Sequence, residues 1–116
     1  MKEVQMARLN YLELPTADIG AAKRFYAAAF GFDFVDFGPT YAATTSGDTD
    51  VGLQADGSEK TAAALPVVEV EDLEAALAAV ETAGGTVTRP IFAFPGGRRF
   101  QFTDPDGHEI GVVQPG

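Results

Sequence analysis

Residues 99–113 read Arg-Phe-Gln-Phe-Thr-Asp-Pro-Asp-Gly-His-Glu-Ile-Gly-Val-Val, a turn with strand-like residues on both sides. Pro105 fixes φ at the first corner of the turn, and Asp104 can accept hydrogen bonds from the backbone that follows it. Gly107 can adopt the positive φ that such a turn requires. The stretch therefore predicts a β-hairpin.

The sequence repeats one pattern twice, and Asp72 lies 54 residues after Asp18. In the first copy, a strand candidate at 9–14 precedes Asp18, which suits a helix N-cap, and the apolar periodicity of a helix continues to Gly31. In the second copy the strand candidate is 65–70, Asp72 is the cap and Gly85 matches Gly31. Strand-like segments follow each helix, at 32–37, 40–45 and 51–54 and then at 86–92, 99–103 and 110–114.

The order β-α-β-β-β therefore occurs twice, which predicts an α+β fold. This order, together with the hairpin at 99–113, resembles the vicinal-oxygen-chelate superfamily, which includes glyoxalase I, extradiol dioxygenases, and fosfomycin- and bleomycin-resistance proteins. The resemblance covers residues 7–115 as a single domain with modules at 7–55 and 63–115. It implies an open half-barrel with helices on the convex face and a ligand site in the concavity. Residues 1–6 are expected to form a flexible extension, and a generic ferredoxin-like or other α+β domain is the alternative fold.

Composition excludes several classes of function. Seventeen acidic against eight basic residues give a net charge of −9, which disfavours nucleic acid as a partner. No apolar run approaches the ~20 residues that span a bilayer, so no membrane association is expected. The chain has no cysteine, hence no disulfide framework and no thiolate metal site. The expected compartment is the cytoplasm.

The resemblance also implies where a divalent metal would bind, since enzymes of the superfamily hold one with a side chain from each of four strands. The corresponding positions here are Tyr11, Gly52, Leu65 and Gly111, a set without imidazole or carboxylate. We interpret His108, the only histidine, as part of the turn. The sequence therefore predicts no metal and no other cofactor.

Strand alternation indicates which side chains line the concavity. It assigns Tyr11 and Glu13 to that side of the first strand, and Arg99 and Gln101 to that side of the hairpin. The glycines at the former ligand positions either give a ligand room or allow close backbone packing. Glu13 and Arg99 either pair with each other or both contact a ligand. The predicted ligand-binding residues are Tyr11, Glu13, Gly52, Leu65, Arg99, Gln101 and Gly111.

The function predicted from these features is metal-free binding of a small organic ligand, as in the resistance-type members of the superfamily that sequester an antibiotic or metabolite. A homodimer is expected, because the superfamily covers exposed sheet edges and apolar surface in that way. The alternative is a glyoxalase-like enzyme, a lyase or isomerase, that uses Glu13 as acid or base without a metal.

Overall fold

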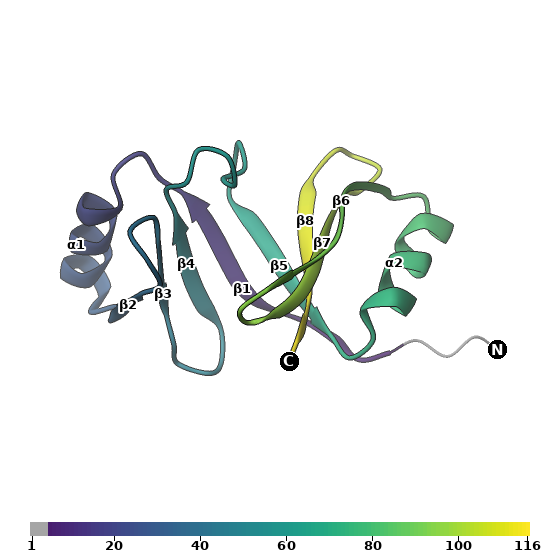
Figure 1. Cartoon of the computed structure of the whole chain (residues 1–116), viewed down its shortest axis with the longest axis horizontal. Coiled ribbons are helices and arrows are strands. Elements are labelled where there is room, and N and C mark those ends of the chain that lie inside the picture. Colours follow the sequence, from purple (N-terminus) through teal and green to yellow (C-terminus); the bar gives the residue numbers. More distant parts are fainter. Residues whose placement is uncertain (1–4) are drawn as a thin grey trace. The chain divides into compact units, whose positions relative to one another are not determined.

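The computed structural model describes residues 5–116, which form eight strands and two helices (Figure 1). The first repeat contains β1 (Ala7–Pro15), α1 (Ile19–Phe30), β2 (Phe34–Asp36), β3 (Tyr41–Thr44) and β4 (Asp50–Gln54). The second contains β5 (Leu65–Val70), α2 (Leu73–Thr82), β6 (Thr86–Phe94), β7 (Gly97–Thr103) and β8 (Glu109–Pro115). The α+β fold class and the two βαβββ modules are confirmed. Residues 1–4 of the expected extension lie outside the described part, in which neither helix is long and apolar enough to cross a membrane.

The chain divides into two compact units, one comprising Asn10–Leu65 and the other Pro66–Gly116 with the N-terminal stretch up to Leu9. In the first, the strands lie in the order β2-β3-β4-β1, and β1 runs parallel to β4. In the second, the order is β6-β7-β8-β5, and β5 runs parallel to β8. Glu13 pairs with Gly52 in the first parallel ladder, as Val67 pairs with Gly111 in the second. The sequence repeat is thus a repeat of topology and register.

Both helices begin where the sequence predicts, because each leading aspartate caps the backbone. Asp18 accepts a hydrogen bond from the Ala21 N–H at 3.0 Å, and Asp72 accepts one from the Ala75 N–H at 3.0 Å. The exit of α1 is the predicted Gly31, with φ of 72°.

The exit of α2 differs from the prediction by one residue. Gly84, not Gly85, has the positive φ, at 104°. Gly85 is needed for close approach instead, because a Cβ there would lie 2.6 Å from Cγ1 of Val80. The two adjacent glycines therefore have different roles, since Gly84 ends the helix and Gly85 allows close packing against Val80.

Helix α2 lies along the strands of its own unit (Figure 1) and forms the core with them. Leu73 and Phe100 are completely buried and pack in one cluster with Val70 and Val112, and Phe102 packs against that cluster. Phe100 and Phe102 of β7 both pack with the core on the α2 side. Residues 99 and 101, which alternate with them, consequently lie on the face of the sheet opposite α2.

The predicted turn between β7 and β8 is confirmed in detail. Oδ1 of Asp104 accepts hydrogen bonds from the N–H groups of Asp106 and His108, both at 2.9 Å. Gly107 has φ of 89°, the left-handed conformation that glycine adopts without strain. These hydrogen bonds, with the His108 N–H first, hold the pKa of Asp104 below its usual range. The two hydrogen bonds to Asp104 and the left-handed conformation of Gly107 thus fix the geometry of the hairpin.

Candidate functional site

Two tyrosines and a glutamate form a polar group in the first unit. The sheet order places β4 between β3 and β1, and the side chains of Tyr41 and Tyr11 reach over Gly52 of β4 from the two sides. The Tyr11 and Tyr41 hydroxyls form a short hydrogen bond. The Tyr41 hydroxyl donates to Oε1 of Glu13 at 3.1 Å. We call Tyr11, Tyr41 and Glu13 the tyrosine–glutamate group.

Gly52 lies in close contact with the two tyrosines. A Cβ at this position would fall well inside van der Waals contact with both tyrosine hydroxyls and 2.7 Å from Cζ of Tyr11. The missing side chain therefore gives room to the protein's own tyrosines. Of the two interpretations open at the outset, room for a ligand and close packing, the structure favours packing, by side chains rather than by backbone.

Burial affects the ionisation of Tyr41 in this group. Glu13 is only 2% exposed, although carboxylates are rarely so buried without hydrogen-bonding partners. Burial, followed by the effects of Tyr11 and Glu13, raises the pKa of Tyr41 far above its usual value. The Tyr41 hydroxyl keeps its proton and donates the hydrogen bond to Glu13. The group has a fixed direction of hydrogen bonding that ends at Glu13.

The second unit has a separate series of hydrogen-bonded polar side chains on the face of the sheet opposite α2. Arg99 donates to Oε1 of Gln101 at 3.0 Å, and Gln101 donates to Oε2 of Glu109 at 2.9 Å. Thr88 donates to the same Glu109 oxygen at 3.0 Å. Gln101 is 5% exposed, so its amide is held by these contacts rather than by solvent.

The ring of Phe92 lies against two arginine side chains next to this hydrogen-bonded series. The guanidinium carbon of Arg89 lies 3.7 Å from the centroid of the Phe92 ring, and that of Arg99 lies 5.4 Å from it. The register of β6 and β7 explains this, because Arg89 is paired with Gln101 and Phe92 with Arg99. Two of the predicted residues, Arg99 and Gln101, are therefore parts of one ordered network.

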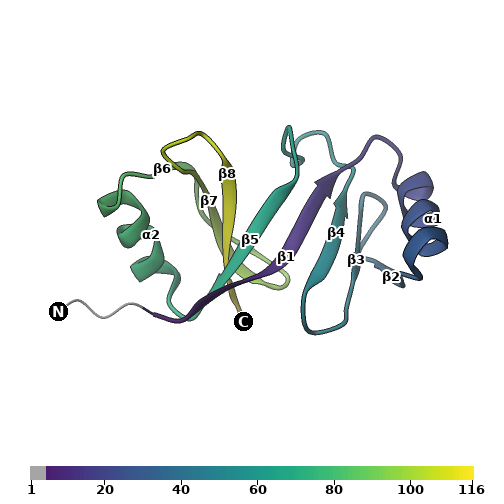
Figure 2. The same ribbon diagram turned by 180° about the vertical axis from the view of Figure 1, so that it is seen from behind.

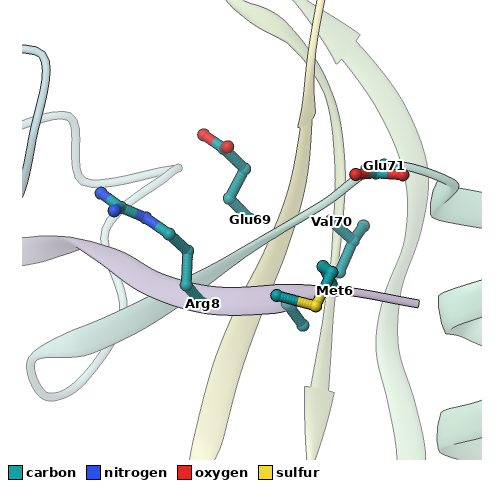
Figure 3. Close-up of a pocket in the computed structure, with 6 residues that line it drawn as sticks. Met6, Arg8, Glu69, Val70 and Glu71 are labelled. Carbon is teal, nitrogen blue, oxygen red and sulfur yellow. The ribbon is translucent and has the colours of Figure 1, made fainter. Parts of the chain in front are cut away.

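A shallow hollow in the second unit lies apart from the predicted residues (Figure 3). It has a volume of about 220 Å³, and it is lined by Met6, Ala7, Arg8, Glu69, Val70 and Glu71. At its edge, the side chain of Gln5 accepts hydrogen bonds from the N–H groups of Glu71 and Asp72, at 2.9 and 2.8 Å. None of the seven predicted ligand-binding residues lines this hollow.

Residues 8–112 match the sequence model of the family described as "Glyoxalase/Bleomycin resistance protein/Dioxygenase superfamily". The chain belongs to this superfamily. The match extends from β1 into β8 and so includes both repeats.

Individual members of the superfamily show how widely the fold is used. The chain is 29% identical over 123 residues to "Putative glyoxylase CFP32" of Mycobacterium tuberculosis, covering 97% of this chain and 47% of that protein. It therefore spans about half the length of the curated relative. Methylmalonyl-CoA epimerase from M. tuberculosis shares the fold with a TM-score of 0.73 at 17% identity, over 93% of this chain and 87% of the epimerase. The Mn(II)-bound glyoxalase from Novosphingobium aromaticivorans has a TM-score of 0.68 at 24% identity, over 94% of this chain and 40% of that one.

The residues at the superfamily's metal-ligand positions do not fit a divalent ion. Gly52 and Gly111 have no donor atom, and Leu65 is a completely buried aliphatic residue. Tyr11 directs its hydroxyl to Tyr41, and the nearby carboxylate of Glu13 accepts from Tyr41. One carboxylate without imidazole is a poor donor set for zinc, nickel, iron or manganese.

A second set of ligand-type residues lies elsewhere, in the turn before β8. Asp104, Asp106 and His108 have ligand atoms within 4.8 Å of one another. Nδ1 of His108 lies 3.0 Å from Oδ2 of Asp104, and the other Asp104 oxygen is used by the turn backbone. These contacts agree with our interpretation of His108 as a turn residue.

Sequence reasoning missed the residue that connects the tyrosine–glutamate group. Tyr41 lay in a predicted strand, but its role depends on the pairing of β3 with β4, in which Ala43 lies opposite Gly52 and Tyr41 opposite Gln54. Strand alternation from Ala43 places Tyr41 on the same face as Gly52. The sequence did contain a signal, because Tyr41 lies two residues before Ala43. Ala43 is a small residue that pairs with the strand glycine Gly52. Glu109 and Phe92 were missed for the same reason, since only the strand register brings them to Gln101 and Arg99.

Proposed function

We propose that this protein binds a small organic ligand without a metal, in the manner of the sequestering members of its superfamily. The tyrosine–glutamate group is the observation that carries this proposal. At the position where the superfamily's enzymes place a metal ligand on β4, this chain has a glycine covered by two tyrosines that are hydrogen-bonded to a buried carboxylate. Such a group recognises ligands by charge, hydrogen bonds and aromatic contact.

The chemistry of the group favours a ligand with a cationic nitrogen. A buried carboxylate forms charge-assisted hydrogen bonds with ammonium groups, and tyrosine rings attract cations through their faces. The net charge of −9 favours the approach of cations in general. An antibiotic or metabolite that carries an amine is therefore the ligand class we propose.

The proposed binding site also includes the other residues that the sequence predicts to bind the ligand. They are Gly52 and Leu65, which shape the first unit, and Arg99, Gln101 and Gly111, which belong to the second. We also propose that the protein acts as a homodimer in the cytoplasm. Exposed edge strands support self-association, since β2 in the first unit and β6 in the second pair on one side only among the described strands.

Calorimetric titration with benzylamine tests the proposed ligand class, with benzyl alcohol as the uncharged counterpart. We expect benzylamine to bind and benzyl alcohol to bind much more weakly. Glu13→Gln should weaken benzylamine binding by about 1.5–3 kcal/mol, because one charge-assisted hydrogen bond is lost. Added EDTA should leave the affinity unchanged.

Tyr41→Phe provides the second arm, and Tyr26→Phe is its matched control. Tyr26 stacks on Phe32 with ring centroids 6.2 Å apart, outside the tyrosine–glutamate group. We expect Tyr41→Phe to weaken benzylamine binding and Tyr26→Phe to leave it unchanged. Equal affinities for benzylamine and benzyl alcohol, or a wild-type affinity in Glu13→Gln, would contradict the proposal.

An enzymatic function is the second candidate, and one observation favours it. A buried carboxylate that accepts a hydrogen bond from a protonated tyrosine is a pair of the kind that general acid–base catalysis uses. In that case Glu13 removes a proton from a bound substrate and Tyr41 stabilises the resulting charge, as in a lyase or isomerase. Mass-spectrometric detection of a product from a bound ligand, lost in Glu13→Gln, would support turnover over sequestration.

A further inference from the structure

The three members of the tyrosine–glutamate group differ in burial. Glu13 is only 2% exposed, whereas Tyr11 and Tyr41 are half-buried. Figure 2 shows β4 between β1 and β3, the two strands that supply these side chains. A ligand that approaches this group from solvent therefore meets a tyrosine before it meets the carboxylate.

The hydroxyl of Tyr41 lies in the middle of the group, and its proton is already used. A phenol has one proton to donate, and its oxygen has lone pairs that accept. The proton of Tyr41 goes to Oε1 of Glu13, because a carboxylate accepts and does not donate. In the hydrogen bond between the two hydroxyls, Tyr11 must therefore be the donor and Tyr41 the acceptor. The hydrogen bonds run in one direction, from Tyr11 through Tyr41 to Glu13.

Tyr11 is consequently the outer end of this series, and its oxygen can act only as an acceptor. Its single proton is directed to Tyr41, so any other group that hydrogen-bonds to this oxygen must supply the proton itself. Ammonium groups with at least one N–H supply it. Quaternary ammonium groups have the same charge and no N–H, so they cannot form this hydrogen bond.

The carboxylate at the inner end makes the Tyr11 oxygen a stronger acceptor. Hydrogen bonds in series polarise one another, so the charge on Glu13 increases the electron density on the Tyr41 oxygen and then on the Tyr11 oxygen. A positively charged donor forms a charge-assisted hydrogen bond with such an oxygen. The arrangement thus favours a cation that is also a hydrogen-bond donor.

We propose that Tyr11 selects the ligand by accepting a hydrogen bond from an N–H of a protonated amine, and that cations without an N–H are rejected. The inference rests on the proposed function, because it specifies which cationic ligands the tyrosine–glutamate group binds. A site built to hydrogen-bond one group of a ligand discriminates strongly against the analogue that lacks it. Tyr41 acts through Tyr11, whose proton it holds, and is therefore a positioning residue.

Calorimetric titration with benzylamine and with benzyltrimethylammonium tests this selection, since the two probes share the ring and the charge. We expect the wild type to bind benzylamine about 10-fold or more tightly than benzyltrimethylammonium. Tyr11→Phe should lose most of this preference, because it has no oxygen to accept the N–H. The ratio of the two affinities within each protein removes the effect of the larger trimethyl group and of any general weakening of the site.

Tyr26→Phe is the matched control and should keep the wild-type ratio, because Tyr26 packs with Phe30 and Phe32, outside the group. An unchanged ratio in Tyr11→Phe, in a protein that still prefers benzylamine over benzyl alcohol, would overturn the role of Tyr11 and leave the proposed ligand class standing. A wild type that does not prefer benzylamine over benzyl alcohol would overturn the ligand class and this inference with it.

Nuclear Overhauser effects between benzylamine and tyrosine rings locate the ligand directly in the wild-type protein, so this measurement does not depend on how well Tyr11→Phe folds or binds. We expect the methylene protons beside the amine to show an effect to the ring protons next to the Tyr11 hydroxyl. Signals to Tyr26 should be absent. Bound benzylamine without an effect to Tyr11 would contradict the proposed contact.

Discussion

Gly52 shows how one residue without a side chain determines the chemistry around it. Tyr11 and Tyr41 meet over it, and their hydroxyls connect to the buried carboxylate of Glu13. Any larger residue would have to displace one of the rings. The absence of a metal ligand at this position is therefore accompanied by a specific packing arrangement.

Substitution of Gly52 by alanine tests that arrangement. We expect Gly52→Ala to lower the free energy of unfolding by about 1–3 kcal/mol, because its Cβ collides with both tyrosine hydroxyls. Urea unfolding monitored by circular dichroism measures the change. Part of the loss should return when Tyr11→Phe and Tyr41→Phe remove the two colliding oxygens.

Gly57→Ala is the control for this substitution. Gly57 has open space where a Cβ would lie and does not have a positive φ. We therefore expect a change within about 0.5 kcal/mol, as for most surface substitutions. If Gly52→Ala were as mild as Gly57→Ala, the close packing of the tyrosines over Gly52 would be refuted.

The raised pKa of Tyr41 predicts a specific loss of stability in alkali. Its pKa in the folded protein is raised, first by burial and then by Tyr11 and Glu13, whereas in the unfolded chain it ionises near pH 10. Above that pH the unfolded state loses the proton and the folded state keeps it. The free energy of unfolding should then fall with rising pH by about 1.4 kcal/mol per pH unit from this group alone. Below pH 10 the group adds no pH dependence.

Urea unfolding between pH 8 and pH 11 measures this effect, with Tyr41→Phe beside the wild type. We expect the wild type to lose stability above about pH 10 more steeply than Tyr41→Phe, which has no proton to lose there. Tyr26→Phe should behave like the wild type. Parallel curves for the wild type and Tyr41→Phe would show that Tyr41 ionises normally in the folded state.

At the scale of the elements, the N-cap residues of the helices contribute to the stability of the fold. Asp72 caps α2, the helix that supplies Leu73 to the core. We expect Asp72→Ala to lower the free energy of unfolding by about 0.5–2 kcal/mol, and Asp72→Asn to retain most of the stability because its amide oxygen still accepts the Ala75 N–H. Urea unfolding of both variants separates these outcomes, and equal losses would mean that the cap contributes little.

Much of the fold could be predicted from the sequence, because its signals are local. The turn at Asp104–Gly107, the caps at Asp18 and Asp72 and the alternation in β7 depend on residues only a few positions apart. The exit of α2 was misplaced by one residue, since both Gly84 and Gly85 fit the local signal and only packing against Val80 distinguishes them.

The candidate site was less predictable, because its contacts join residues far apart in the sequence. Tyr11 and Glu13 could be assigned to one face by alternation. Tyr41 could not be connected to them without the register of β3 on β4, and that register has no local signature. The absence of buried residues in α1 was likewise hidden, since its apolar periodicity is that of a packed helix.

At the scale of the whole molecule, the chain combines the fold of its superfamily with a donor set that does not fit a divalent metal. The central property that we propose is then recognition of a small ligand by the protein's own side chains. Both the titration with benzylamine and the alkaline unfolding depend on the same three residues. If neither benzylamine binding nor the alkaline loss of stability depended on these residues, the function would lie elsewhere in the chain.

Native mass spectrometry of the protein purified from its own host tests metal-independent ligand binding most directly. We predict a bound small organic molecule that stays bound after treatment with EDTA, that is lost or weakened in Glu13→Gln, and that is not accompanied by a stoichiometric divalent ion. A zinc, nickel, iron or manganese ion bound at one per chain, whose removal by EDTA also releases the organic molecule, would contradict the account.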